Sequence, residues 1–172
     1  NAFDIFRPEV LKEEIRRHPA AEAPRMKENF THINFGWLGY WVPDEKTVGT
    51  QPDMLEYVSS RAAAWDCPIS IQSSLKKFDD HPRTADNFEV MRRWEEVRNN
   101  DLLTAAQKLS LQQLEQEHIL LINEKNEFEL QPYDQITNVA GNSREVRAFI
   151  FERGGSLYVV YWHISGAKQL EL

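Results

Sequence analysis

The sequence predicts an α/β unit with a parallel sheet, followed by an all-β unit of antiparallel strands. A buried strand, an amphipathic helix and a second short buried strand follow one another between residues 31 and 72, the pattern of a parallel βαβ unit. Other helical segments precede residue 117, and strand segments with turns between them follow it. We therefore predict two units, 1–116 and 117–172.

The elements of the first unit are placed by turn residues and by apolar spacing. A helix begins near Pro8, a residue favoured at the first helical position, and ends at His18. A strand covers residues 30–35. A helix with Pro52 in its first turn then repeats apolar residues at helical spacing, and residues 68–71 form the second strand.

Two further helices and several strands complete the prediction. Thr84 caps a helix whose inward residues are Phe88, Met91, Trp94 and Val97. The next helix runs from Thr104 to about residue 116, with Leu109 and Leu114 inward. Strands are expected at residues 118–123, 128–131, 146–152 and 157–164, the last two joined by Gly154 and Gly155 as a hairpin.

The composition disfavours two classes of partner. The chain has 172 residues, with 20 Lys and Arg against 27 Asp and Glu, a net charge of −7. We therefore expect neither a nucleic acid nor a membrane surface as partner. No signal peptide is recognised, and no apolar run approaches the ~20 residues of a membrane helix. The sequence leaves the compartment open.

The thiol and imidazole groups predict no metal site and no cofactor. Cys67 is the single cysteine, which excludes an intrachain disulfide and a site built on several thiolates. The histidines are scattered without metal-ligand spacing. No other sequence feature indicates a cofactor.

Five segments resemble the C-terminal part of large bacterial glycoside hydrolases, of which α-L-fucosidase-like enzymes are one example. They read GlyTrpLeuGlyTyrTrp, ThrGlnProAspMetLeuGluTyr, SerArgAlaAlaAlaTrpAspCysProIleSer, ArgArgTrpGluGluValArg and LeuTyrValValTyrTrpHisIleSerGly. The resemblance spans nearly the whole chain. It implies that residues 1–116 are the last βα units of a (β/α)8-type barrel, and that residues 117–172 begin a small antiparallel β-sandwich. A whole barrel needs ~250 residues, so the rest of it would come from the same polypeptide or from another subunit.

This resemblance implies a carbohydrate substrate, and three aromatic residues are the strongest candidates to bind it. Trp37, Tyr40 and Trp41 follow the first strand of the βαβ unit. Loops after barrel strands build the active face, and flat aromatic rings suit the C–H face of a sugar. The alternative is that these rings fill the core, as large aromatic side chains often do.

Polar residues near the same strands complete the candidate site. His32 precedes the aromatic cluster and Asp44 follows it, so both are candidate substrate contacts. The alternatives are a core histidine and a solvated loop carboxylate. Ser70 and Gln72 lie on or just beyond the second strand; a hydrogen bond to a sugar hydroxyl and a structural role are both open for them.

The catalytic residues of a glycosidase cannot be assigned in this chain. Hydrolysis needs two carboxyl groups on opposite sides of the scissile bond. Asp44 and Glu45 are adjacent in the sequence and do not suit that geometry. We expect the catalytic pair upstream and the isolated chain to be inactive. The alternatives are a non-catalytic carbohydrate-binding or protein-interaction module and a purely structural domain.

Overall fold

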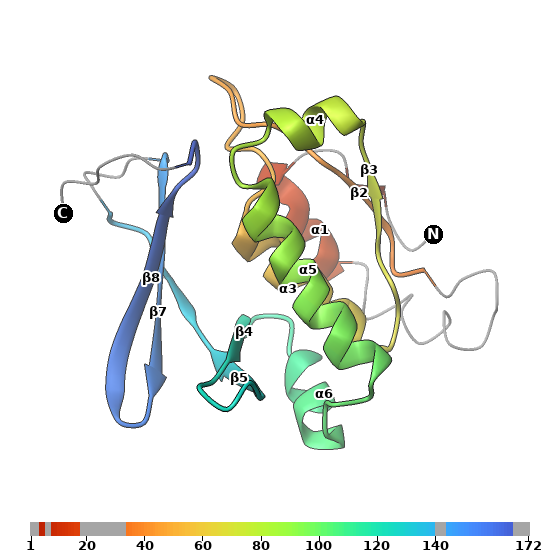
Figure 1. Ribbon diagram of the computed structural model, residues 1–172, viewed down its shortest axis with the longest axis vertical. Helices are drawn as coiled ribbons and strands as arrows, with labels where there is room; N and C mark the ends of the chain where they lie inside the picture. Colours follow the sequence, from red (N-terminus) through yellow and green to blue (C-terminus); the bar gives the residue numbers. More distant parts are fainter. Residues whose placement is uncertain (1–3, 6–7, 18–33, 140–143, 167–172) are drawn as a thin grey trace.

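The protein is a mixed α/β chain with a small parallel sheet and two antiparallel sheets (Figure 1). The computed structural model describes residues 4–5, 8–17, 34–139 and 144–166. These residues form five α-helices and eight strands. Their parallel strands precede their antiparallel ones, as the sequence predicts, and no closed barrel is present among them.

The parallel sheet has three strands in the order β1-β2-β3. They are β1 (Asp4–Ile5), β2 (Trp37–Gly39) and β3 (Ser70–Gln72). In the β2–β3 ladder Trp37 pairs with Ser70, Leu38 with Ile71 and Gly39 with Gln72. Neighbours in the sheet are thus consecutive in the sequence.

The second predicted strand was placed too early in the sequence. The prediction of a strand at 30–35 falls largely outside the described residues, and the observed strand begins at Trp37. The second strand begins at Ser70 instead of residue 68. The physical reason is the register of the two strands. The backbone N–H of Phe35 already donates to the carbonyl of Pro68 at 2.7 Å. Regular strand pairing, however, starts only where Trp37 pairs with Ser70.

Helices follow the parallel strands. A 3-10 turn, η1 (Pro8–Val10), leads into α1 (Leu11–Arg17), so the predicted first helix is confirmed. Helix α3 (Pro52–Ala64) joins β2 to β3 and starts at the predicted proline. Three further helices are α4 (Leu75–Asp80), which the sequence analysis missed, α5 (Thr84–Asn99) and α6 (Ala105–Leu111).

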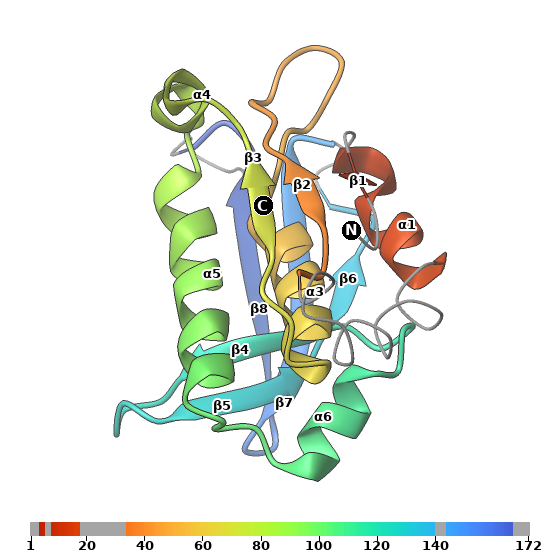
Figure 2. The same ribbon diagram turned by 90° about the vertical axis from the view of Figure 1, so that its right-hand side faces the viewer.

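The helices α1, α3 and α5 lie on one side of the parallel sheet (Figures 1 and 2). Leu38 is fully buried in the core cluster, and Ile71 packs against that cluster. Because side chains alternate between the faces of a strand, Trp37, Gly39, Ser70 and Gln72 belong to the opposite face. No described helix covers that side, which we call the open face.

Two predicted core residues are exposed. In α5 the buried residues are Asn87, Val90, Trp94 and Val97, whereas Phe88 is 42% exposed. The predicted helix over 104–116 ends at Leu111, and Leu109 is 62% exposed. Trp94 and Val97 are buried as predicted, whereas in the first half of α5 the buried positions are Asn87 and Val90 instead of Phe88 and Met91. Helix α5 packs along α3, and this packing determines which positions are buried.

The second half of the chain is antiparallel. Strands β4 (His118–Ile122) and β5 (Phe128–Pro132) form one sheet. Strands β6 (Asp134–Ile136), β7 (Val146–Arg153) and β8 (Ser156–His163) form another in that order. The turn between β7 and β8 uses Gly154 and Gly155, both at positive φ, as a two-residue hairpin requires.

A buried ion pair joins the helices to the second sheet. The guanidinium of Arg147 on β7 donates from Nε to Asp53 Oδ1 at 2.6 Å and from Nη2 to Oδ2 at 2.5 Å. Lys12 of α1 lies 2.9 Å from the same carboxylate. Strand β4 packs against α3 and α5 (Figure 2). None of the helices in the described part of the chain is long and apolar enough to span a bilayer.

Candidate functional site

The open face of the parallel sheet brings together some of the residues that the sequence analysis singled out, among them Trp37, Ser70 and Gln72. Trp37 is 43% exposed, and its ladder partner Ser70 is partly exposed. Asn34 donates from Nδ2 to Ser70 Oγ at 2.5 Å and accepts from the backbone N–H of Gly36 at 2.9 Å. The hydroxyl beside the Trp37 ring is therefore held in position.

Residues 37, 39 and 41 continue the alternation beyond the end of β2. Leu38 and Tyr40 are fully buried, whereas Trp37, Gly39 and Trp41 are at least partly exposed. Gly39 between the two tryptophans has no side chain, which leaves the backbone accessible between two indole rings.

A hollow of about 380 Å³ lies at the carboxyl ends of β2 and β3. We call it the rim hollow. Its lining residues supply an indole, a carboxamide, two hydroxyls and an ammonium group; they are Gly39, Tyr40, Trp41, Gln72, Ser73, Ser74 and Lys77. None of them carries a carboxyl group. Such groups can hydrogen-bond neutral hydroxyls but provide no acid–nucleophile pair.

Trp41 is fixed by a contact of its ring and by hydrogen bonds of its backbone. The ammonium of Lys77 lies 4.9 Å from the centre of its ring, a cation–π contact. The backbone N–H of Trp41 donates to Thr50 Oγ1 at 3.0 Å, and the backbone N–H of Thr50 donates to the carbonyl of Trp41 at 2.8 Å. The loop over 42–49 is thus closed at its base.

Helix α4 contributes the other wall of the rim hollow. Ser74 is its N-cap, and the side chain accepts from the backbone N–H of Lys77. This cap places Lys77 in the first turn, facing Trp41. The signal that could have located the helix is the Ser-Leu-Lys-Lys sequence after β3, in which a serine stands in the N-cap position.

Tyr40 lies behind this site, in the core. Its ring packs between Phe78, His81 and Phe88 at centroid distances of 4.9–6.4 Å. Its hydroxyl is hydrogen-bonded to Thr84 Oγ1 at 2.9 Å and accepts from Asn87 Nδ2 at 2.9 Å. Burial raises the pKa of this phenol. The structure thus places Tyr40 in the core, whereas Trp37 is exposed and Trp41 is partly exposed.

Asp44 lies apart from the rim hollow. Its carboxylate accepts from the backbone N–H groups of Lys46 and Thr47 at 2.7 and 2.9 Å, and these bonds lower the pKa of the carboxyl. It lines a separate hollow with Glu45 and Arg144. His32, the remaining candidate, falls outside the described residues.

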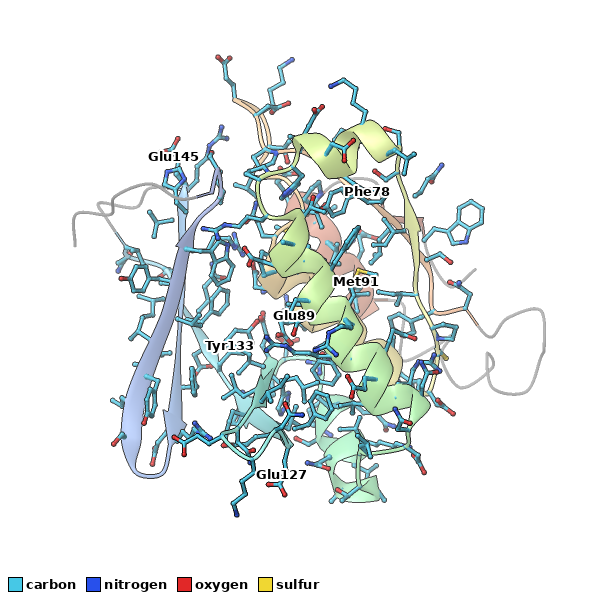
Figure 3. The ribbon with its side chains drawn as sticks, viewed as in Figure 1. Phe78, Glu89, Met91, Glu127, Tyr133 and Glu145 are labelled. Atoms are coloured by element: carbon cyan, nitrogen blue, oxygen red, sulfur yellow. The ribbon has the colours of Figure 1, made fainter. Side chains whose placement is uncertain are left out.

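A second group of titratable side chains, which the sequence analysis missed, lies between α3, α5 and β8. This interlayer pocket has a volume of about 260 Å³, and Asp53, Glu56, Tyr133 and Trp162 contribute to its walls. Figure 3 shows Tyr133 between the β7–β8 hairpin and α5, near Glu89. The available signal was two acidic residues, Asp53 and Glu56, three apart beside the apolar stripe of the predicted helix.

The two carboxyl groups of this pocket have opposite electrostatic environments. Burial of Asp53 opposes its charge, but Arg147 and Lys12 outweigh burial and hold the pKa of Asp53 well below its usual range. Burial raises the pKa of Glu56 to about 8, and hydrogen bonds from Trp94 and Leu120 offset this only in part. At neutral pH Asp53 is therefore charged and Glu56 is protonated.

Comparisons with known proteins add no identity to this geometry. No protein-family model, no curated protein and no solved structure matches the chain. Within the described residues, no three His, Cys, Asp or Glu side chains are grouped so that they could hold a metal ion.

Proposed function

We propose that this chain is the C-terminal portion of a glycoside hydrolase that acts on oligo- or polysaccharides. It supplies one wall of the sugar-binding cleft and a stabilising antiparallel module. The catalytic carboxylates are contributed by the remainder of the same polypeptide or by another subunit. The carrying observation is the open face, where Trp37 and Trp41 flank Gly39 beside Ser70 and Gln72.

The strand order supports this proposal. In a (β/α)8 barrel, consecutive parallel strands are neighbours, the helices lie outside, and the loops after the strands form the active face. The order β1-β2-β3, with α1, α3 and α5 on one side, has this arrangement. The rim hollow lies at the carboxyl ends of two of these strands. On this proposal the open face is the interior side of the barrel wall.

The side-chain chemistry of the open face favours a neutral, hydroxylated ligand. Indole rings cover the apolar C–H face of a sugar, and the hydroxyl and amide groups of Ser70, Ser74 and Gln72 can bond its hydroxyls. Lys77 is the one charged group among the lining residues, and its charge is directed at the ring of Trp41. This set of groups suits sugar binding without acid–base chemistry.

A second candidate function is a non-catalytic carbohydrate-binding or protein-interaction module. It is favoured by the absence of carboxyl groups among the residues that line the rim hollow, because hydrolysis requires two carboxyl groups within ~10 Å of each other. Hydrolytic activity of a longer protein, with upstream repeats and two carboxylates, separates the two functions.

The first test is a binding measurement with neutral oligosaccharides by calorimetry. We expect Trp37→Ala and Trp41→Ala to weaken binding at least tenfold each, ~1.4 kcal/mol. The matched control is Tyr158→Ala, an aromatic side chain of similar exposure on β8, which should leave affinity unchanged. Equal affinity of all three variants would contradict the proposal.

The chain alone should not cleave aryl glycosides; cleavage would show that the catalytic pair is present within it.

A further inference from the structure

The interlayer pocket has apolar walls and room for a small molecule. The apolar side chains of its walls are Val90 of α5, Ile119 of β4, and Val160 and Trp162 of β8. Its volume is about 260 Å³, and a cavity of ~150 Å³ is sufficient to bind benzene. The indole of Trp162 is fixed, because its Nε1 donates to Gln51 Oε1 at 3.0 Å and its ring stacks on Phe149. The pocket can therefore hold one ring with a short substituent.

Two arginines hold the walls of the pocket at a fixed separation. Arg83, at the start of α5, donates from Nε and Nη2 to the carbonyl of His163 at the end of β8, at 3.0 and 2.9 Å. Arg93 of the same helix donates from Nη1 to the carbonyl of Leu120 on β4 at 3.3 Å. Helix α5 is thus tied to both strands that face it across the pocket. The space between them is a defined feature of the fold.

The hydroxyl of Tyr133 is a buried polar group without a partner. Tyr133 lines the pocket between the β7–β8 hairpin and α5 (Figure 3) and is only 2% exposed. Its hydroxyl oxygen makes no hydrogen bond with the residues that the structure describes. Burial, and then the charges of the nearby Asp53 and Glu56 carboxyl groups, raise the pKa of this phenol, so the hydroxyl lies on the side of those two groups. Because buried hydroxyls are normally paired, this one indicates a place for a ligand atom.

Glu56 supplies a second donor to the same pocket. The two hydrogen bonds that it makes within the described residues both end on Oε2, from Trp94 Nε1 at 2.5 Å and from the backbone N–H of Leu120 at 3.4 Å. Since Oε2 accepts twice, the proton of the neutral acid resides on Oε1, which becomes an O–H donor. A phenol and a neutral carboxylic acid in an apolar site can both donate to one oxygen atom.

The charges around the pocket favour a neutral ligand. Every ionised carboxylate and guanidinium that lines it has a partner of opposite charge. The pairs are Asp53 with Arg147 and Lys12, Asp86 with Arg83, and Glu89 with Arg93. A charged ligand would lose its hydration in the pocket without gaining a free counter-charge, which is costly.

We propose that the interlayer pocket binds a neutral compound with one apolar ring and a carbonyl oxygen. The ring lies against Val160 and Trp162, and the carbonyl oxygen accepts hydrogen bonds from the Tyr133 hydroxyl and from Glu56 Oε1. A carbonyl oxygen has two lone pairs and can accept both. This binding site does not depend on sugar binding at the open face, since the two sites share no lining residue.

Nuclear magnetic resonance titrations of the 172-residue chain test this site, with the indole N–H of Trp162 as the reporter. The probe is acetophenone. Its controls are α-methylstyrene, which has the same shape with a CH₂ group in place of the oxygen, and benzoate, which is charged. We expect saturable binding of acetophenone, roughly tenfold weaker binding of α-methylstyrene, and none of benzoate. Absence of saturable acetophenone binding would overturn the proposal and leave the pocket to water, and equal affinity for the first two probes would exclude recognition of the oxygen.

Two variants test the donors. Tyr133→Phe should weaken acetophenone binding roughly tenfold, yet should not lower the thermal unfolding midpoint of the free protein, because the hydroxyl has no partner to lose. A lower midpoint would instead show that the hydroxyl has a structural role. Glu56→Gln should retain the affinity: Trp94 and Leu120 require the amide oxygen as their acceptor, so the amide N–H group takes the place of the acid donor. Loss of binding in a folded Glu56→Gln variant would contradict the role of Glu56.

A filling variant tests the location. Val160→Phe should abolish binding of acetophenone and of α-methylstyrene, because the larger side chain occupies the pocket. The matched control is Val159→Phe, since Val159 is the neighbouring residue of β8, is 52% exposed and does not line the pocket; it should leave both affinities unchanged. Unchanged binding in Val160→Phe would show that the probes bind elsewhere, and would overturn the proposal.

Discussion

Nε1 of Trp94 on α5 donates a hydrogen bond to Oε2 of Glu56 on α3 at 2.5 Å, and both side chains are buried. The same oxygen accepts from the backbone N–H of Leu120 on β4 at 3.4 Å. One carboxyl group thus links two helices and a strand. Because burial raises the pKa of Glu56 to about 8, the link is formed by a neutral acid at pH 7.

The first prediction is that stability falls as the pH rises through the neutral range. The unfolded carboxyl has a pKa near 4.5 and the folded one near 8, so the native state holds its proton more tightly. This contribution is complete below pH ~4.5 and is lost as the pH rises through ~8. Urea unfolding at pH 5 and pH 9 should differ by roughly 4 kcal/mol.

Glu56→Gln is the matched variant for this prediction. The amide keeps the shape and cannot ionise, so the variant should lose most of the difference in unfolding free energy between pH 5 and pH 9. If the variant kept the full difference in unfolding free energy between pH 5 and pH 9, a group other than Glu56 would cause that difference. Glu89→Gln is the control: Glu89 is a partly exposed carboxylate on α5, paired with arginines, and should leave the difference intact.

The second prediction concerns the ion pair of Asp53 with Arg147 and Lys12. Asp53→Asn should destabilise the fold by about 3–5 kcal/mol, because it leaves buried cations without a counter-charge. The folded pKa of Asp53 is depressed, so its stabilisation is present above pH ~3.8 and is lost as the pH falls below that value. Thermal unfolding at pH 6 and pH 3 checks both statements.

A double-mutant cycle measures the interaction energy between Asp53 and Arg147 separately from any general destabilisation of the core. Asp53→Asn combined with Arg147→Met removes both charges of the bidentate contact. We expect the double variant to be less destabilised than the sum of the single variants by more than about 1 kcal/mol. Strict additivity would mean that the contact contributes little.

The third prediction is that the loop beside Trp41 depends on Gly49. Its φ is 69°, and a Cβ at this position would lie 2.6 Å from the backbone nitrogen of Pro43. Gly49→Ala should destabilise the protein by about 2–4 kcal/mol through strain and steric conflict. Gly154→Ala is the control, since its φ is also positive but nothing lies within 4 Å; it should cost about 1 kcal/mol. Equal losses would exclude the steric conflict.

The fourth prediction assigns Tyr40 to packing. Tyr40→Phe removes the hydroxyl that bonds Thr84 and Asn87 and leaves the ring in place. We expect a loss of about 1–2 kcal/mol in the free energy of unfolding with unchanged oligosaccharide affinity. A large loss of affinity in a stably folded variant would instead make Tyr40 a sugar contact.

Much of the fold follows from local sequence signals. Pro52 marks the start of α3, the Gly154–Gly155 pair marks the β7–β8 hairpin, and the strand–helix–strand order predicts a parallel sheet. These signals act through φ preferences and apolar periodicity, which are properties of neighbouring residues. The exposed positions of Phe88 and Leu109 were not predictable in this way, because exposure depends on which distant element packs against a helix.

The candidate site also has features that the sequence predicts and features that only packing decides. Trp37, Tyr40 and Trp41 are recognisable as a cluster from the sequence, because they end one apolar segment. Only packing separates them: alternation about Gly39 leaves the two tryptophans at the surface, while contacts with Phe78 and Asn87 bury Tyr40.

Amino-acid order alone was sufficient for the type and order of most elements, though not for α4, and for the aromatic cluster, since these depend on local backbone preferences. Long-range packing was needed to set the charge states of Asp53 and Glu56 and the position of Trp37 beside Ser70. Each of these depends on desolvation or on contacts between residues far apart in the chain.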